Sequence, residues 1–351
     1  MKDDNLEEGL SSEKPSNATL YAVAGDSMAA IIRVYLGLAL STEGFNKLAL
    51  SDLDTDVKKR IVLAGIGSPL DPLKCSAKQV LEEWTRMQSV QFSVEESVTK
   101  GVYISLRERV EILLIEMKQA TGNFQTFDAE YIASHSYLLP VFQRLLNASS
   151  KSKLKELVGS VSDNSISKPA AKRIADILNN SKPGREITLN DLKLSIEPTL
   201  EGIVRDLVGR VLLEDVVANA LDLAGVTYKR ESEYTSIKGV VYDFRADFVL
   251  PDENNPLVFI EVRKSSSRHA SLYAKDKMFS AINWKGHNKQ LMAILVTEGP
   301  WTDQTLKTMA KVFDYVVPLR KAPQMAEIVS AYMNGDSSKL RLLIDFAVRP
   351  A

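Results

Sequence analysis

The sequence predicts an α+β protein, within the wider α/β class, in which helices flank a mixed central sheet that follows a mainly helical N-terminal region. Apolar residues recur at helical spacing up to about residue 146, whereas from residue 199 short β-rich runs alternate with helical stretches. The second part has the order α-β-β-β-α-β-α-β-α. Hairpins followed by βα crossovers indicate a mixed sheet covered by helices, here with an αβββαβ core.

Three regions are expected along the 351 residues. Residues 1–18 are polar, contain Pro15 and lack periodicity, which is typical of a flexible tail. Residues 19–190 form the mainly helical region and residues 191–351 form the second domain. A stretch rich in Ser, Lys and Asn at 147–170 indicates an exposed connection between elements.

Each helix of the N-terminal region is predicted from an apolar stripe with i, i+3, i+4, i+7 spacing. The two clearest stripes are Met28, Ile31, Ile32, Tyr35, Leu36 and Leu40, and then Leu106, Val110, Leu113, Leu114 and Met117. Two further short helices, at 170–178 and 187–192, also suit a winged helix-turn-helix, which stays open as a second interpretation.

The C-terminal part begins with a long helix that ends before Gly225, a suitable residue after a helix C-terminus. Its buried strands are recognised by unbroken apolar runs. The helices are expected at 199–224, 267–284, 302–312 and 322–333, and the strands at 227–234, 240–250, 257–263, 291–297 and 315–319.

Composition excludes several classes of protein. The formal net charge of −1 excludes a uniformly basic nucleic-acid binder. A single cysteine, Cys75, excludes an internal disulfide framework, and together with only three histidines it leaves too few ligands for a structural zinc site. A catalytic metal would be held mainly by carboxylates, which favours Mg²⁺. No Gly-x-x-x-x-Gly-Lys-Ser/Thr pattern occurs, so we expect no nucleotide cofactor.

No membrane span is expected. The most apolar run, Met28–Leu40, has about 13 residues and contains Arg33, whereas a span needs about 20. The acidic residues before it are the wrong flank for a signal peptide. The sequence therefore predicts a cytoplasmic protein.

Two carboxylates occupy positions that strands disfavour. Asp247 lies within the predicted strand 240–250, and Glu261 follows the apolar run Leu257–Ile260. If these strands are adjacent and antiparallel, the two carboxylates come close together. A divalent cation relieves the repulsion between them.

The residues after Glu261 add a cation to this pair. Side chains alternate along a strand, so Glu261 and Arg263 share a face and Val262 points to the core. A cation two residues after a metal-binding carboxylate can contact an attacking water or a scissile phosphate. This arrangement favours metal-dependent hydrolysis of phosphodiester bonds.

Asp247, followed fourteen residues later by Glu261-Val262-Arg263, resembles the signature of the PD-(D/E)xK nuclease superfamily, and the element order resembles its common core. The resemblance covers residues 199–320. It implies that Glu214, on the apolar face of the first core helix, assists Asp247 and Glu261 as a metal ligand. It also implies a Mg²⁺-dependent double-stranded DNA endonuclease that works as a homodimer, like a type II restriction enzyme of a restriction-modification system. The region 19–190 would then serve recognition, dimerisation or both.

The sequence departs from the family at the lysine position. Arg263 stands where the family has Lys, and Lys264 follows it. Arginine is permanently charged and cannot act as a base, so its role would be electrostatic, to stabilise the transition state. A strand bulge would be needed to bring Lys264 to the same face.

Residues 261–290 carry a local charge of +5. Basic and hydroxyl side chains hold phosphates, and an aromatic ring such as Trp284 can stack on bases. The predicted phosphate contacts are Arg268, Lys275, Lys277, Lys285 and Lys289. The competing interpretation is the solvated face of an amphipathic helix.

The roles of the acidic residues and the function each admit a second interpretation. Asp247 and Glu261 could be strand-end residues paired with Arg245, Arg263 or Lys264, and Asp243 competes with Asp247 as a ligand. A repair, recombination or transposon-associated nuclease is the second functional hypothesis. A catalytically inactive DNA-binding module is the third, because arginine replaces the motif lysine.

Overall fold

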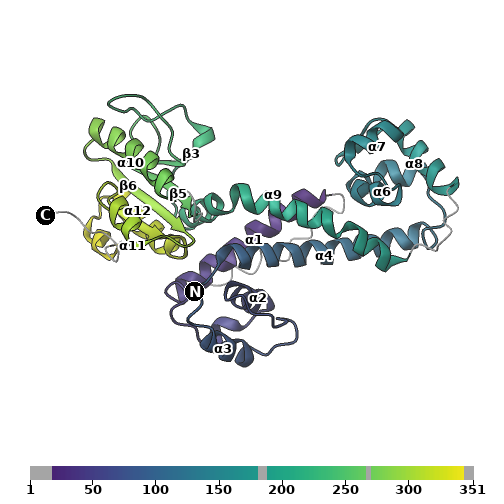
Figure 1. Cartoon of the computed structure of the whole chain (residues 1–351), viewed down its shortest axis with the longest axis horizontal. Coiled ribbons are helices and arrows are strands. Elements are labelled where there is room, and N and C mark those ends of the chain that lie inside the picture. Colours follow the sequence, from purple (N-terminus) through teal and green to yellow (C-terminus); the bar gives the residue numbers. More distant parts are fainter. Residues whose placement is uncertain (1–17, 181–187, 266–269, 344–351) are drawn as a thin grey trace. The chain divides into compact units, whose positions relative to one another are not determined.

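The computed structural model describes residues 18–180, 188–265 and 270–343, with the side chains of 270–275 and 341–343 left aside (Figure 1). The fold is mixed α+β, as predicted, with a helical N-terminal region, a five-stranded mixed sheet and a small antiparallel sheet. Contacts divide the chain into two compact units. The first unit contains the described residues of Met1–Ile31 and Val98–Arg210, and the second those of Ile32–Ser97 and Val211–Ala351.

The first unit is built from helices and one β-hairpin. The predicted stripe of Leu106, Val110 and Leu114 is buried along α4, which confirms the helical spacing of the sequence. The elements of this unit, including parts of the helices α1, α4 and α9 that continue into the second unit, are α1 Leu20–Ser41, α4 Val94–Ala120, α5 Ala129–Ser134, η3 Ser136–Leu138, α6 Leu139–Leu145, α7 Lys151–Val158, β1 Val161–Ser162, β2 Ser165–Ile166, α8 Lys168–Asn180 and α9 Leu189–Leu223.

Helix α9 begins ten residues before the predicted start at residue 199, so the separate short helix expected at 187–192 is wrong. Thr188 caps this earlier start, because its hydroxyl accepts the backbone N–H of Asp191 at 3.1 Å. Pro198 lies inside the helix. Proline normally breaks a helix, but here buried apolar residues on both sides, among them Ile196 and Leu200, pack against the rest of the unit.

The second unit contains the main sheet, whose strand order is β3-β4-β5-β6-β7. The antiparallel pairs β3–β4 and β4–β5 are followed by the parallel pairs β5–β6 and β6–β7, so the predicted order of elements is confirmed. Its strands are β3 Lys229–Arg230, β4 Phe248–Leu250, β5 Val258–Lys264, β6 Met292–Glu298 and β7 Tyr315–Pro318. Its further elements are η2 Leu50–Leu53, α2 Asp56–Gly65, α3 Ala77–Arg86, η4 Glu231–Glu233, α10 Ala270–His287, α11 Asp303–Met309, η5 Leu319–Lys321, α12 Ala322–Met333 and η6 Ser338–Leu343.

The strand predicted at 240–250 is reduced to its last three residues, so Asp247 immediately precedes β4 instead of lying inside a strand. The backbone before it pairs with helix α10. Asn283 accepts the N–H of Val241 on its side-chain oxygen at 2.8 Å and donates to the carbonyl of Tyr242 at 2.7 Å. Gly239 allows this approach, because a Cβ there would lie 1.9 Å from the Asn283 amide nitrogen.

The core of the second unit surrounds the central strands. All residues of β6 from Met292 to Thr297 are buried, which explains the unbroken apolar run in the sequence. Trp284 is fully buried and meets the ring of Phe259 edge-on, with centroids 4.8 Å apart. The expectation that Trp284 stacks on bases is therefore wrong.

Helix α1 extends the apolar run of the sequence to 22 residues, which by length and composition alone would suffice to cross a membrane. Half of its most apolar window is buried inside the protein. Core helices of soluble proteins have the same properties, so α1 is consistent with a soluble protein.

Candidate functional site

The antiparallel pairing of β4 and β5 brings Asp247 and Glu261 together. Phe248 pairs with Ile260, so the preceding Asp247 lies beside Glu261. The Oδ2 of Asp247 accepts the backbone N–H of Val262 at 2.6 Å. Asp247 is 5% exposed and Glu261 is fully buried. Two acidic side chains from adjacent strands thus meet in the interior of the sheet, as the sequence predicted.

Arg263 contacts both carboxylates. Its Nη1 lies 2.8 Å from Oδ2 of Asp247, and its Nη2 lies 2.7 Å from Oε2 of Glu261. Arg263 therefore shares a face with Glu261, as strand alternation predicted. These contacts also match the competing interpretation, in which the two acids are partners of an arginine.

Lys277 of helix α10 is the fourth member of the group. Its Nζ lies 3.0 Å from Oε2 of Glu261. The charge pattern of the sequence predicts phosphate binding for Lys277 and does not reveal this contact. A usable signal was present, because Lys277 precedes the fully buried Ala281 and Trp284 at i+4 and i+7 and so lies on the apolar face of the helix. We call Asp247, Glu261, Arg263 and Lys277 the carboxylate–cation cluster.

Burial governs the electrostatics of the cluster. Complete burial, reinforced by the charge of Asp247, raises the pKa of Glu261 to about 8, and the nearby Arg263 and Lys277 only partly oppose this shift. Burial and the charge of Asp247 also raise the pKa of Glu214, which lies half-buried on α9. Glu214 therefore lies within electrostatic range of the cluster.

The oxygens around the Arg263 guanidinium are suited to a hard cation. Its Nη1 contacts the carbonyl oxygen of Val262 at 2.5 Å in addition to Oδ2 of Asp247, and its Nη2 contacts Oε2 of Glu261. Three oxygens from neighbouring strands thus converge on one cationic group, and oxygen is the ligand type that Mg²⁺ prefers. Within the described residues, no three or more His, Cys, Asp or Glu side chains are placed to hold a metal together, so Glu214 as a ligand stays a prediction.

The remaining predicted residues lie away from the cluster. Lys264 points away and pairs with Glu95, and Lys285 pairs with Asp314 at 2.6 Å. These partners leave both lysines less available to phosphates than the sequence suggested. Lys289 is exposed.

Two further acidic and basic candidates are not part of the cluster. Asp243 is exposed and accepts the backbone N–H of Gly239 at 3.1 Å, so it does not compete with Asp247. Arg245 is exposed and contacts Glu231. Arg268 and the side chain of Lys275 lie outside the described residues.

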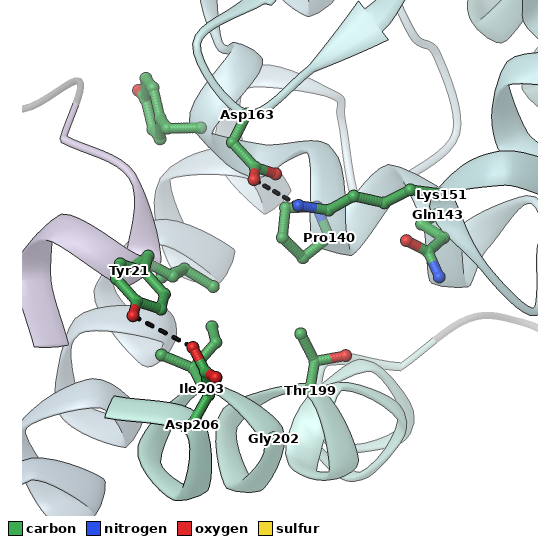
Figure 2. A pocket seen from close by; sticks show the side chains of 11 residues that line it. Tyr21, Pro140, Gln143, Lys151, Asp163, Thr199, Gly202, Ile203 and Asp206 are labelled. Carbon is green, nitrogen blue, oxygen red and sulfur yellow. Dashed lines mark hydrogen bonds and ion pairs between the residues drawn. The ribbon is translucent and has the colours of Figure 1, made fainter. Parts of the chain in front are cut away.

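The first unit contains a separate pocket of about 310 Å³ between α1, α6, α7 and α9 (Figure 2). Its charged side chains are partnered within the chain. Tyr21 donates to Asp206 at 3.1 Å, and Lys151 forms an ion pair with Asp163. None of the residues predicted from the sequence to be functional lines this pocket.

No protein-family model, curated protein or solved structure matches the chain. The function of the site therefore has to follow from its own geometry.

Proposed function

We propose that the protein is a Mg²⁺-dependent endonuclease that hydrolyses phosphodiester bonds of double-stranded DNA on a PD-(D/E)xK-type core. One observation carries the proposal. Two buried carboxylates, Asp247 and Glu261, lie side by side on adjacent strands and share a cation, Arg263. Buried carboxylates are costly to keep in a core, and proximity to a second one adds repulsion. A bound divalent ion would relieve this repulsion, and a metal-dependent reaction would explain why two carboxylates lie in the core.

Asp247, Glu261 and the carbonyl of Val262 would hold the ion. When bound, Mg²⁺ supplies positive charge beside the phosphate and lowers the pKa of water. The backbone N–H of Val262 fixes the orientation of the Asp247 carboxylate. Arg263 would leave its contacts with the carboxylates as the ion enters and turn to the phosphate, where its fixed charge stabilises the transition state.

Lys277 is the better candidate for the role of the motif lysine. Unlike Arg263 it can give up a proton, and its Nζ is already 3.0 Å from Glu261. Lys264 is half-exposed and held by Glu95. Lys277 would orient the attacking water beside Glu261 and add positive charge at the phosphate.

The wider assignment follows from the same proposal. We expect a sequence-specific type II enzyme in the cytoplasm, acting as a homodimer so that two clusters cut the two strands. The helical region 19–190 would contribute recognition, dimer contacts or both. A repair, recombination or transposon-associated nuclease on the same core would use the same residues.

A catalytically inactive DNA-binding module is the second candidate, and one observation favours it. Arg263 contacts both carboxylates at ion-pair distance, so the charges are compensated within the chain. Digestion of a plasmid with Mg²⁺ and with EDTA separates the possibilities. Discrete fragments support a restriction enzyme, structure-dependent nicks support a repair nuclease, and DNA mobility shifts without cutting support the inactive module.

A further inference from the structure

A second pocket, of about 420 Å³, lies within the second unit, lined by the segments that follow α1 and α3 and by Arg320. It is independent of the carboxylate–cation cluster, none of whose members lines it. It contains several polar side chains without partners among the described residues. These groups indicate what kind of ligand it would take.

The position of the pocket relates it to the sheet. Strands β5, β6 and β7 are parallel and end at Lys264, Glu298 and Pro318. Arg320 follows β7 directly, in η5. In open α/β sheets, ligands bind outside the carboxyl ends of parallel strands. Arg320 therefore lies at the edge of the sheet where ligands are expected.

The guanidinium of Arg320 has one buried donor without a partner. Its Nε is buried without a hydrogen-bond partner, and no residue that the structure describes forms an ion pair with the side chain. Glu298 lies within electrostatic range but makes no hydrogen bond to it. A buried donor that lacks a partner is costly, and an anion is the natural partner of a guanidinium. The pocket is thus prepared for a phosphate or a similar anion.

The other walls combine free amides with aromatic rings, of which Phe45 and Trp84 are buried and Phe92 is partly exposed. The rings of Phe45 and Phe92 are stacked with centroids 3.8 Å apart, and Trp84 lines the pocket beside them. Gln88 and Gln91 line it too, and neither amide is hydrogen-bonded to a described residue. Aromatic rings stack on bases, and an amide can both donate to and accept from a base edge.

The backbone is shaped to form these walls. Glu43, Gly44 and Phe45 are successive residues with left-handed φ of 52°, 76° and 63°, and the hydroxyl of Thr42 accepts the N–H of Phe45 at 3.0 Å. This turn follows the end of α1 and places Phe45 in the pocket wall. A Cβ at Gly65 would lie 2.2 Å from the Phe92 ring, so a glycine at this position leaves room for that ring.

We infer that this pocket binds one nucleotide, with its phosphate on Arg320 and its base against the aromatic and amide walls. The nucleotide is either free or part of a DNA strand from which it has turned outward. Turning a base out of a duplex costs a few kcal/mol, which stacking and hydrogen bonds in a pocket offset. The inference extends the proposed function. It rests on that function only if the nucleotide belongs to a DNA strand.

The test uses calorimetry on the full chain in EDTA. The probes are the four deoxynucleoside 5′-monophosphates, a deoxynucleoside and inorganic phosphate. A monophosphate should bind at least tenfold more tightly than either fragment, and Arg320→Gln should weaken it about tenfold or more. Arg86→Gln is the matched control, because Arg86 pairs with Glu83 and does not line the pocket. Absence of binding at millimolar concentration, or equal loss in both variants, would overturn the inference.

Two further measurements keep the test decisive. If Arg320→Gln does not fold, the exposed double variant Gln88→Ala with Gln91→Ala should reduce discrimination among the four monophosphates; unchanged discrimination would contradict the base contact. Displacement of bound monophosphate by a short DNA duplex identifies DNA as the source of the nucleotide, whereas binding of free monophosphate that the duplex does not displace identifies the free source. Because EDTA prevents hydrolysis, the result stands apart from the outcome of the cleavage assay.

Discussion

The Nζ of Lys277 lies 3.0 Å from Oε2 of Glu261, although sixteen residues separate them in the sequence. Helix α10 follows β5 in the chain. It lies so that Lys277 contacts Glu261 of β5. The contact gives the cluster a compact ammonium group beside the planar guanidinium of Arg263. It also makes the two candidates for the motif lysine distinguishable by experiment.

Lys277→Ala should lower the single-turnover rate of DNA cleavage with Mg²⁺ by about 100-fold or more, as expected when a charge aimed at the reacting groups is removed. Lys264→Ala is the matched control, since Lys264 is paired with Glu95 away from the cluster, and it should retain nearly the full rate. A larger loss in the Lys264 variant would reverse the assignment.

Asp247→Asn and Glu261→Gln should each bring cleavage below detection while leaving DNA affinity in Ca²⁺ close to that of the wild type. The substitutions remove a proposed ion ligand but preserve side-chain shape. Gel-shift titration in Ca²⁺ and plasmid digestion in Mg²⁺ measure the two properties. Full cleavage by either variant would refute the site.

Arg263→Ala should destabilise the metal-free protein by about 3 kcal/mol or more, because it leaves two adjacent buried carboxylates without their shared partner. Urea unfolding in EDTA measures this loss. Mg²⁺ should restore more stability in the variant than in the wild type, since the ion replaces the missing cation. The control Lys264→Gln removes an exposed ion pair and should cost less than about 1 kcal/mol. If Mg²⁺ fails to stabilise the Arg263 variant, the oxygens do not form a metal site.

Stability should decrease with rising pH through the titration of Glu298. Burial raises the pKa of this carboxyl to about 7, with Arg320 and Lys264 lowering it and Glu95 raising it. The folded protein therefore binds a proton between about pH 4.5 and 7 that the unfolded chain has already lost, and stability falls across this range. Burial and the charge of the nearby Glu298 raise the pKa of Tyr35.

Glu298→Gln should consequently show a smaller difference in melting temperature between pH 5 and pH 8 than the wild type. The comparison isolates Glu298, because the other carboxyls with raised pKa, Glu214 and Glu261, titrate in both proteins. An identical pH dependence in the two proteins would contradict the raised pKa.

Gly65→Ala should destabilise the protein by about 1–3 kcal/mol, because the new methyl group would overlap the ring of Phe92 at 2.2 Å. Gly202→Ala is the contrasting change, since Gly202 lies inside α9 with open space around it. That variant should gain about 0.5–1 kcal/mol from helix propensity. Urea unfolding followed by circular dichroism measures the stability of both variants. Stabilisation by Gly65→Ala would show that the Phe92 ring can move aside.

The order of the sheet was predictable because each central strand is a short apolar run bounded by turn residues. The proximity of Asp247 and Glu261 followed from one further step, the antiparallel pairing of neighbouring strands. The backbone of residues 240–242 was not predictable in the same way. It pairs with Asn283, about forty residues away, and a local pattern does not contain that partner.

Lys277 shows a different limit. Its position on the apolar face of α10 was visible in the sequence, but seven basic residues in 261–290 suggested a phosphate-binding surface instead. Ion pairs with Glu261 and Asp314 engage Lys277 and Lys285 in the folded chain. A count of charges along the sequence does not reveal which of them are compensated by residues brought near by folding.

The composition of the carboxylate–cation cluster has a consequence for the order of events. Its two acids are matched by two bases, so the cluster is electrically neutral when Glu261 is ionised and carries one positive charge when that carboxyl, with its pKa of about 8, is protonated. A polyanion that approaches before any metal ion meets no net repulsion from these four groups. In the proposed nuclease, DNA and cation could therefore bind in either order, and the resting protein could scan DNA before it holds an ion.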